Sequence, residues 1–245
     1  MKKKSVNFVI TLLLACFFSS SVFASVTIIG TRIIYPAAEK EVTVRLDNRS
    51  DQPALVQAWI DSGDPNQPVD KINVPFIMLP PVFRMEANKG QTLRIVYTGS
   101  NLPADKESIF WLNVLDIPPK DKSLVDKNQL QMAVRSRIKL FYRPTKLNSA
   151  GAESAAVGLV WRKGAKSNQL TAINHSPYHV NVAQITAEDT AGRNVMSEKG
   201  DMLEPGGSKD FTLKTTNVNQ LKPTFHYQYL DDFGAARQVE GQISQ

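Results

Sequence analysis

The chain has 245 residues with 29 basic and 23 acidic side chains, and its formal net charge of +6 includes three lysines at the N-terminus. Without them the excess is 26 − 23 = +3, too small to indicate a nucleic-acid-binding surface, and the sequence has no zinc-finger spacing, RNA-binding signature or dense basic helix. The length suffices for two domains, each with its own core.

The N-terminus has the pattern of a secretory signal peptide. Three lysines precede an apolar run over residues 8–18, and a stretch of small residues ends at Val22-Phe23-Ala24. The apolar run is about half of the roughly 20 residues that a membrane-spanning helix needs, which argues against a retained anchor. We therefore expect that residues 1–24 are removed by cleavage after Ala24 and that the mature chain begins at Ser25.

The single cysteine, Cys16, allows another interpretation. Leu13-Leu14-Ala15-Cys16 resembles the lipid-attachment box of bacterial lipoproteins, which would tether a mature chain that starts at Cys16. Phe17 and Phe18 continue the apolar region past this cysteine and favour the ordinary cleavage site, but lipidation stays open. A chain cut after Ala24 has no cysteine and no disulfide, so its stability must come from core burial.

Alternating apolar and polar residues predict strands in the first half of the chain. Val42, Val44 and Leu46 alternate with polar residues at the two-residue period of a half-buried strand. Turn-rich sequence separates six further expected strands at 26–35, 54–60, 76–79, 92–97, 108–117 and 128–142. Seven strands without crossover helices indicate an immunoglobulin-like sandwich.

A second β-sandwich is expected after Pro144. This proline follows the longest predicted strand and cannot donate a ladder hydrogen bond, and residues 146–151 form a polar stretch that we expect to be flexible. Short β segments then recur at 157–161, 170–175, 180–187, 211–213, 225–229 and 237–243. We predict an all-β protein with an N-terminal domain at 25–144 and a C-terminal domain at 145–245.

The sequence offers no convincing catalytic or metal-binding motif. His175 and His179 are four residues apart, which brings two metal ligands together only on a helix, and Pro177 and the strand context oppose a helix here. No serine lies in a nucleophile-elbow pattern, and no phosphate-binding glycine loop or cofactor fingerprint is present. We expect no catalytic residue, no metal and no cofactor, and therefore no enzyme.

Residues 129–144 are the most informative segment, because they are far longer than a typical strand of five or six residues. The even-numbered side chains are almost wholly apolar. The last of them fit a sandwich core, whereas the first three can extend along an exposed edge: Leu130, Met132 and Val134. A single long core strand fits the pattern equally well. An exposed apolar edge invites aggregation unless a partner uses it.

Four motifs in consistent order resemble one known family. They are GTRIIYP (30–36), LPADKESIFWLN (102–113), IPP (117–119) and RIKLFYRP (137–144). Together they resemble the PapD-like periplasmic chaperones of the chaperone–usher pilus pathway. The resemblance implies two immunoglobulin-like β-sandwich domains in a boomerang arrangement, located in the periplasm. The short, charged segment 120–128 resembles the short-loop branch of this family.

The resemblance also implies a function. Such a chaperone binds, folds and caps pilus subunits by donor-strand complementation and delivers them to an outer-membrane usher. By position in the motif, Leu130, Met132 and Val134 are the donor side chains that enter the subunit. The implied partners are pilus subunits and the usher, with no nucleic acid and no small-molecule cofactor. The sequence leaves open whether the free chain covers its edge as a self-capping dimer.

Two sets of charged residues have roles that the resemblance implies. Arg32 and Lys139 would grip the terminal carboxylate of the subunit. The second set would hold the two domains at their angle: Glu107, Arg143 and Asp232. One difficulty stays open, because Lys139 is odd-numbered and the donor residues are even-numbered. A regular strand places the two on opposite faces, and only a bulge or strong twist would re-aim the lysine.

Two functions from other classes remain as alternatives. An adhesin-like or receptor-like sandwich would bind carbohydrate or protein through its loops and would not need Arg32 and Lys139. A secreted hydrolase on a β-sandwich would need a cluster of serine, histidine and aspartate side chains, for which the sequence shows no pattern.

Overall fold

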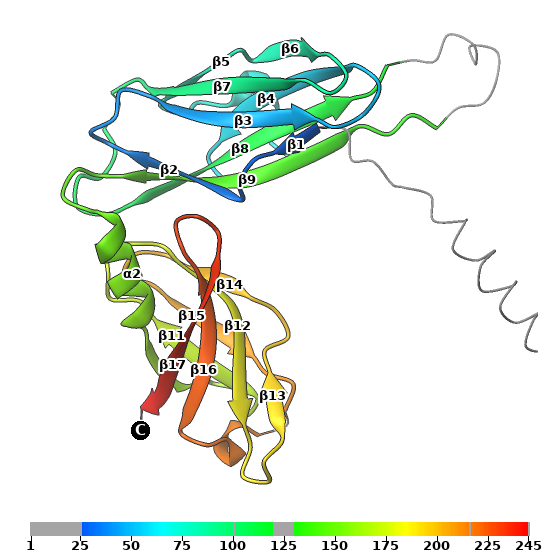
Figure 1. The fold of residues 1–245 in the computed structure, drawn as a ribbon. Helices are drawn as coiled ribbons and strands as arrows, with labels where there is room; N and C mark the ends of the chain where they lie inside the picture. The colour runs from blue at the N-terminus through cyan, green and yellow to red at the C-terminus, as the bar shows by residue number, and fades with distance from the viewer. Residues whose placement is uncertain (1–25, 100, 120–129, 216, 245) are drawn as a thin grey trace, which may run out of the picture.

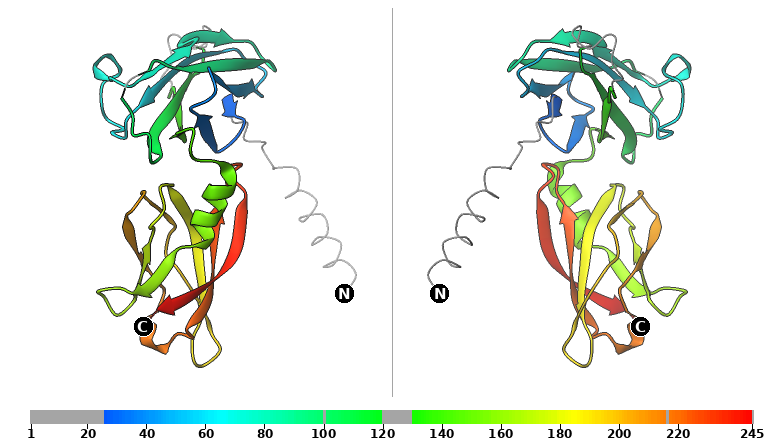
Figure 2. Two further views of the ribbon diagram at one scale, coloured as in Figure 1. Left: turned by 90° about the vertical axis from the view of Figure 1, so that its left-hand side faces the viewer. Right: turned by 90° about the vertical axis from the view of Figure 1, so that its right-hand side faces the viewer.

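The computed structural model describes residues 26–99, 101–119, 130–215 and 217–244. The predicted signal peptide, its cleavage site and Cys16 lie outside the described residues, as does segment 120–128, on which the short-loop prediction rests. The described chain folds into two β-rich bodies that meet at one end of each, with the bent outline of a boomerang (Figure 1). Figure 2 shows the same two bodies from either side. The prediction of an all-β protein with two sandwiches is confirmed.

Two sheets make up the first sandwich. The first sheet has the order β1-β3-β7-β5, with β1 (Val26–Ile28), β3 (Val42–Asn48), β7 (Gly90–Tyr97) and β5 (Phe76–Leu79). The second has the order β2-β9-β8-β4-β6, with β2 (Arg32–Pro36), β9 (Val134–Arg143), β8 (Ser108–Ile117), β4 (Ala54–Asp61) and β6 (Val82–Met85). A short 3-10 turn, η1 (Val69–Lys71), follows β4. The expected strand at 26–35 is in fact two strands, one in each sheet.

The core of the first sandwich forms where the inward rows of the two sheets meet. Leu46, Leu93 and Leu112 are fully buried, and each comes from a strand whose neighbouring residues alternate outward. Towards the second domain the core becomes aromatic. Tyr35 and Tyr142 lie with their ring centroids 5.8 Å apart, in a cluster of aromatic side chains from both sheets. This packing holds β2 and β9 together at the end of the sandwich that faces the second domain.

Strand β9 is regular, which answers the question of side-chain parity. Its antiparallel register with β8 runs without a shift from Ser108 opposite Tyr142 to Asp116 opposite Val134. There is no bulge, so Lys139 and the even-numbered row lie on opposite faces of the sheet. The expectation of a strand from residue 128 is wrong for residues 130–133, which are described and not in a strand. The reason is that β8 ends at Ile117 and two prolines follow, which cannot donate ladder hydrogen bonds.

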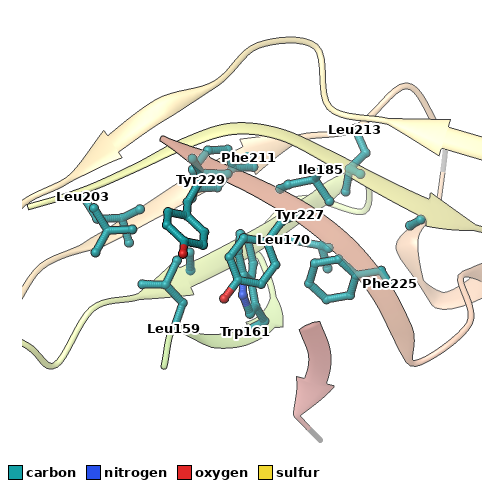
Figure 3. Packing of buried hydrophobic residues seen from close by; sticks show 14 of the residues in the cluster. Leu159, Trp161, Leu170, Ile185, Leu203, Phe211, Leu213, Phe225, Tyr227 and Tyr229 are labelled. Carbon is teal, nitrogen blue, oxygen red and sulfur yellow. The ribbon is translucent and has the colours of Figure 1, made fainter. Parts of the chain in front are cut away.

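The described residues of the second sandwich form eight strands. They are β10 (Val160–Lys163), β11 (Gln169–Ile173), β12 (Val180–Glu188), β13 (Asn194–Met196), β14 (Asp201–Leu203), β15 (Ser208–Thr212), β16 (Thr224–Leu230) and β17 (Ala236–Ser244), with a 3-10 turn, η3 (Val218–Gln220). The connected order is β13-β12-β16-β17-β10-β11-β15, and β14 pairs with β12. Trp161 lies in the centre of the core, and its ring packs against Phe211, Phe225 and Tyr227 (Figure 3).

A helix lies where a flexible stretch was expected. Helix α2 (Ser149–Val157) begins just after Asn148, whose side-chain oxygen accepts the N–H of Gly151 at 2.8 Å. Such a cap satisfies one of the free N–H groups of the first turn, and the alanine-rich sequence has high helix propensity. Ala155 and Ala156 are buried against the second core. The prediction failed because a short helix rich in alanine has no clear apolar stripe.

Candidate functional site

The structure brings Arg32 and Lys139 together at the domain junction. Strand β2 pairs with β9 in parallel, and these two residues are direct partners across the ladder. Because both lie on the outer face of the sheet, their side chains reach the second domain. Arg32 Nη1 donates to the carbonyl oxygen of Leu230 at 3.1 Å, and Lys139 Nζ donates to Asn181 Oδ1. Both acceptors are neutral oxygens.

These two cations form a partly desolvated positive site. Burial lowers the pKa of Lys139 and the adjacent Arg32 lowers it further, while Asp201 acts in the opposite direction. Burial also lowers the pKa of Arg32, against the opposing effect of Asp232 and Asp231. Within the described residues neither cation has a carboxylate within ion-pair distance, and the buried Arg32 Nε has no hydrogen-bond partner. A carboxylate placed here would meet two charged donors.

A cavity of about 240 Å3 lies beside Arg32 between the two domains. Its lining comes from both: Arg32 and Phe141 from the first sandwich, and Asn181 and Tyr229 from the second. The cavity is therefore a feature of the junction and would change if the domains moved.

The other predicted charges form a compact ion cluster in the same junction. Arg143 Nε donates to Glu107 Oε1 at 2.8 Å, and its two terminal nitrogens donate to the two oxygens of Asp232 at 2.7 and 2.8 Å. Glu107 and Arg143 are each only 4% exposed. Burial alone would lower the pKa of Arg143, but the bonds with Asp232 and Glu107 outweigh burial and raise it. Since Asp232 belongs to the second sandwich, this cluster links the domains.

Sequence reasoning missed further contacts of the junction. Glu107 Oε2 accepts the backbone N–H of His179 at 2.8 Å and lies 3.2 Å from His179 Nδ1. The imidazole packs against Phe141, with ring centroids 5.4 Å apart. The sequence raised His179 only as a metal ligand, and nothing in its local pattern indicates an interdomain role. In the described part of the chain no three histidine, cysteine or acidic side chains are placed to hold a metal ion.

The predicted donor residues lie at the free end of β9. Leu130, Met132 and Val134 are 87%, 67% and 58% exposed. Val134 begins β9 in the row that becomes buried at Leu140, and Leu130 and Met132 precede the strand. Strand β2 pairs with β9 only from Lys139 onward. Among the described residues, 134–138 therefore have β8 on one side and no strand on the other. Their edge offers unpaired backbone groups to an incoming strand.

The outer face of β9 is anchored by a network that the sequence did not predict. Arg137 Nη2 donates to the fully buried Asp61 at 2.5 Å, and its guanidinium lies 4.2 Å from the centre of the Trp111 ring. Arg135 stacks over Trp59 in the same manner at 5.0 Å. These contacts fasten the odd-numbered side chains of β9 at Arg135 and Arg137 to β4 and β8.

In the part of the chain that the structure describes, no helix is long and apolar enough to cross a membrane.

Comparison with known proteins identifies the family. Residues 25–148 match the model for "Pili and flagellar-assembly chaperone, PapD N-terminal domain", and residues 154–241 match that for "Pili assembly chaperone PapD, C-terminal domain". The chain is 40% identical over 245 residues to the chaperone protein HifB of Haemophilus influenzae, covering 98% of this chain and 97% of HifB. It is 39% identical over 228 residues to the probable fimbrial chaperone YadV of Escherichia coli K12, covering 91% of each chain.

Solved structures agree with this. The CupB2 chaperone of Pseudomonas aeruginosa superimposes with a TM-score of 0.75 at 35% identity, over 89% of this chain and all of CupB2. The SafB chaperone of Salmonella enterica, solved in complex with the SafA pilin, matches with a TM-score of 0.75 at 25% identity, over 91% of this chain and 99% of the matched chain. Relatives and structures alike are named as chaperones and not as enzymes, in agreement with the sequence prediction. The chain belongs to the family of pilus-assembly chaperones.

Proposed function

We propose that the mature chain works in the periplasm, where it captures pilus subunits by donor-strand complementation and delivers them to an outer-membrane usher. The observation that carries this proposal is the free edge of β9. On the N-terminal side of Lys139, residues 134–138 have no neighbour on the β2 side among the described residues, and the exposed donor residues are apolar. A subunit strand added to this edge would gain ladder hydrogen bonds and side-chain burial together. The complex of SafB with a pilin shows that a related chaperone binds such a subunit.

The donor side chains alone do not provide enough free energy. Burying Leu130, Met132 and Val134 would contribute about 1.5–3 kcal/mol each. Association itself costs about 4–15 kcal/mol, so the three side chains only roughly offset it. The backbone ladder and a charged anchor must supply the remainder.

We propose Arg32 and Lys139 as that anchor, with the terminal carboxylate of the subunit as their ligand. In the free chain both cations donate hydrogen bonds to neutral oxygens, and Arg32 Nε has no hydrogen-bond partner among the described residues. A carboxylate would therefore form an ion pair with each cation and offset the cost of burying their charges. Because a one-residue shift turns every side chain of a strand to the opposite face, a fixed chain end also selects the register of the added strand.

We propose that Glu107, Arg143 and Asp232 keep the cleft open at a defined angle. Their hydrogen bonds connect the first sandwich to the β16–β17 turn of the second. In this proposal the mature chain divides into an N-terminal domain at 25–144, which holds the donor edge, and a C-terminal domain at 145–245. The second domain completes the walls of the carboxylate site through Asn181 and Leu230.

The test is capture of a pilus subunit encoded in the same genome. The chaperone and subunit are co-expressed with their signal peptides, and a soluble one-to-one complex is measured by size exclusion from the periplasmic fraction. Leu130→Glu/Val134→Glu places two charges in the donor row and should abolish the complex. Gln131→Glu/Ala133→Glu adds the same charges at two exposed positions between the donor residues and should retain most of it.

Unfolding curves of the free variants separate loss of binding from loss of folding. All four substituted residues are exposed, so both variants should unfold at the wild-type temperature. Undiminished capture by the Leu130→Glu/Val134→Glu variant would contradict the donor-row proposal. Failure of the wild type to capture any subunit of its genome would contradict the proposed function and favour a sandwich that binds through its loops.

A further inference from the structure

A row of four side chains crosses the outer face of the second sheet of the first sandwich, at the domain junction. Strand β9 lies between β2 and β8, and β8 pairs in turn with β4 (Figure 1). The ladder registers place Arg32 opposite Lys139, Lys139 opposite Trp111, and Trp111 opposite Asp61. Lys139 therefore has a like charge on one side and an aromatic side chain on the other.

Packing of the core does not account for Trp111. Its neighbours on β8, Phe110 and Leu112, are buried in the core of the first sandwich, whereas Trp111 lies on the outer face and is partly exposed. Its ring lies against two cations. The ammonium of Lys139 is 5.6 Å from the ring centre, and the guanidinium of Arg137 is 4.2 Å from it. Both distances are within the roughly 6 Å over which a tryptophan ring attracts a cation.

The turn after β4 packs against the other side of this ring. Asp61 is fully buried and accepts a hydrogen bond from Arg137 Nη2 at 2.5 Å, and the carbonyl oxygen of Gly63 accepts a second at 2.9 Å. A side chain at Gly63 would begin 3.9 Å from Trp111 Nε1, so the backbone of the turn reaches the edge of the ring. The ring therefore has packed neighbours on the side away from Lys139.

We propose that Trp111 is a positioning residue for the carboxylate anchor, whose ring holds the ammonium of Lys139 beside Arg32. This inference rests on the function proposed above and adds how two adjacent cations stay together in the free chain. Burial disfavours the charge of Lys139 and Arg32 repels it, and both effects lower its pKa. A cation–π contact acts in the opposite direction, because it favours the charged form and its place at the ring. The lysine is thus charged and in position before a carboxylate binds.

The same sheet contains a matched tryptophan that is not next to the anchor. Trp59 on β4 is also partly exposed on the outer face, and the guanidinium of Arg135 is 5.0 Å from its ring centre. In the ladder Trp59 lies opposite Asn113, to which Arg135 also donates. Trp59→Leu therefore removes an equivalent ring and an equivalent cation–π contact and leaves Lys139 untouched.

The experiment measures how much of the affinity depends on the terminal carboxylate. A synthetic peptide with the C-terminal sequence of a pilus subunit from the same genome is made with a free carboxylate and with a terminal amide. Isothermal titration calorimetry gives the dissociation constants of both peptides for the full mature chain. We expect Trp111→Leu to weaken binding of the acid by roughly 2- to 30-fold and to leave the amide unchanged. Trp59→Leu should change neither, and Trp111→Tyr, which keeps an aromatic face, should recover part of the loss.

Nuclear magnetic resonance of the Lys139 side chain gives a second measurement that needs no peptide. Because the ring favours the ammonium form, Trp111→Leu should lower the pKa of Lys139 below its wild-type value, and Trp59→Leu should not. If the wild type prefers the acid and Trp111→Leu keeps both that preference and the pKa of Lys139, this inference alone is overturned. A wild type that binds acid and amide equally would overturn the proposed anchor, and this inference with it.

Discussion

Two cationic sites share the domain junction and differ in their partners. Arg143 has two carboxylates, bonds to both with good geometry, and has a raised pKa. Arg32 and Lys139 have only neutral oxygens as acceptors, and burial lowers the pKa of each. The first site is paired with carboxylates in the free chain, whereas the second has only neutral acceptors and, in the function proposed above, receives the carboxylate of the subunit. On this difference rests the proposal that the first is a structural ion cluster and the second a ligand site.

The largest expected effect comes from removing the incomplete site. Each charge-assisted hydrogen bond contributes about 1.5–3 kcal/mol, so Arg32→Ala/Lys139→Ala should weaken subunit binding by about 3–6 kcal/mol, or roughly 10²- to 10⁴-fold. Isothermal titration calorimetry with a purified subunit, or competition for it, measures this loss. Arg45→Ala/Arg84→Ala removes two exposed cations from the same domain as a control. Equal losses in both variants would show that only overall charge matters.

Removing the complete site should damage stability. Arg143→Ala leaves Glu107 and Asp232 without their cation, and breaking such a buried pair costs about 3–5 kcal/mol. Urea unfolding measures the change, and small-angle scattering shows whether the two domains separate. Arg45→Ala breaks an exposed pair with Asp47 and should cost at most about 1 kcal/mol. A similar small loss for Arg143→Ala would remove the distinction between the two sites.

The incomplete site should also make subunit binding depend on pH. Burial lowers the pKa of Lys139 in the free chain, and a bound carboxylate would raise it again. Proton binding and carboxylate binding therefore favour each other, so affinity should fall as the pH rises from 7 through the lowered pKa of Lys139. Dissociation constants measured between pH 7 and 10 test this, with Lys139→Arg as a control that should flatten the profile. A flat wild-type profile would contradict a role for the Lys139 charge.

The smallest expected effect is on the stability of the free chain. Because the folded-state pKa of Lys139 is below its ordinary 10.5, the folded state holds this proton less tightly than the unfolded state. The charged form therefore costs stability below the folded-state pKa, and the cost disappears as the pH rises toward 10.5. Relative to Lys139→Met, wild type should gain stability over this range, as measured by urea unfolding. A gap between the two proteins that stays constant with pH would contradict the lowered pKa.

Much of the site could be predicted from sequence because it depends on local patterns. The alternation in β3 and β9 identified which side chains face the core, and the exposure of Leu130, Met132 and Val134 agrees with the expected edge row. The motif order led to the two-sandwich fold and the family, which the comparisons confirm. Strand alternation is a property of the extended backbone, so it is visible in the sequence of each segment by itself.

Other features were decided only when the chain folded. Arg32 and Lys139 are 107 residues apart in sequence (139 − 32), and they become neighbours only through the parallel pairing of β2 with β9. Their acceptors on the second domain, Leu230 and Asn181, also depend on which distant segments meet. The start of β9 at Val134 was also decided by folding, because a strand extends only as far as the neighbouring strand that pairs with it. Local sequence determines which way a side chain points, whereas topology determines what it meets there.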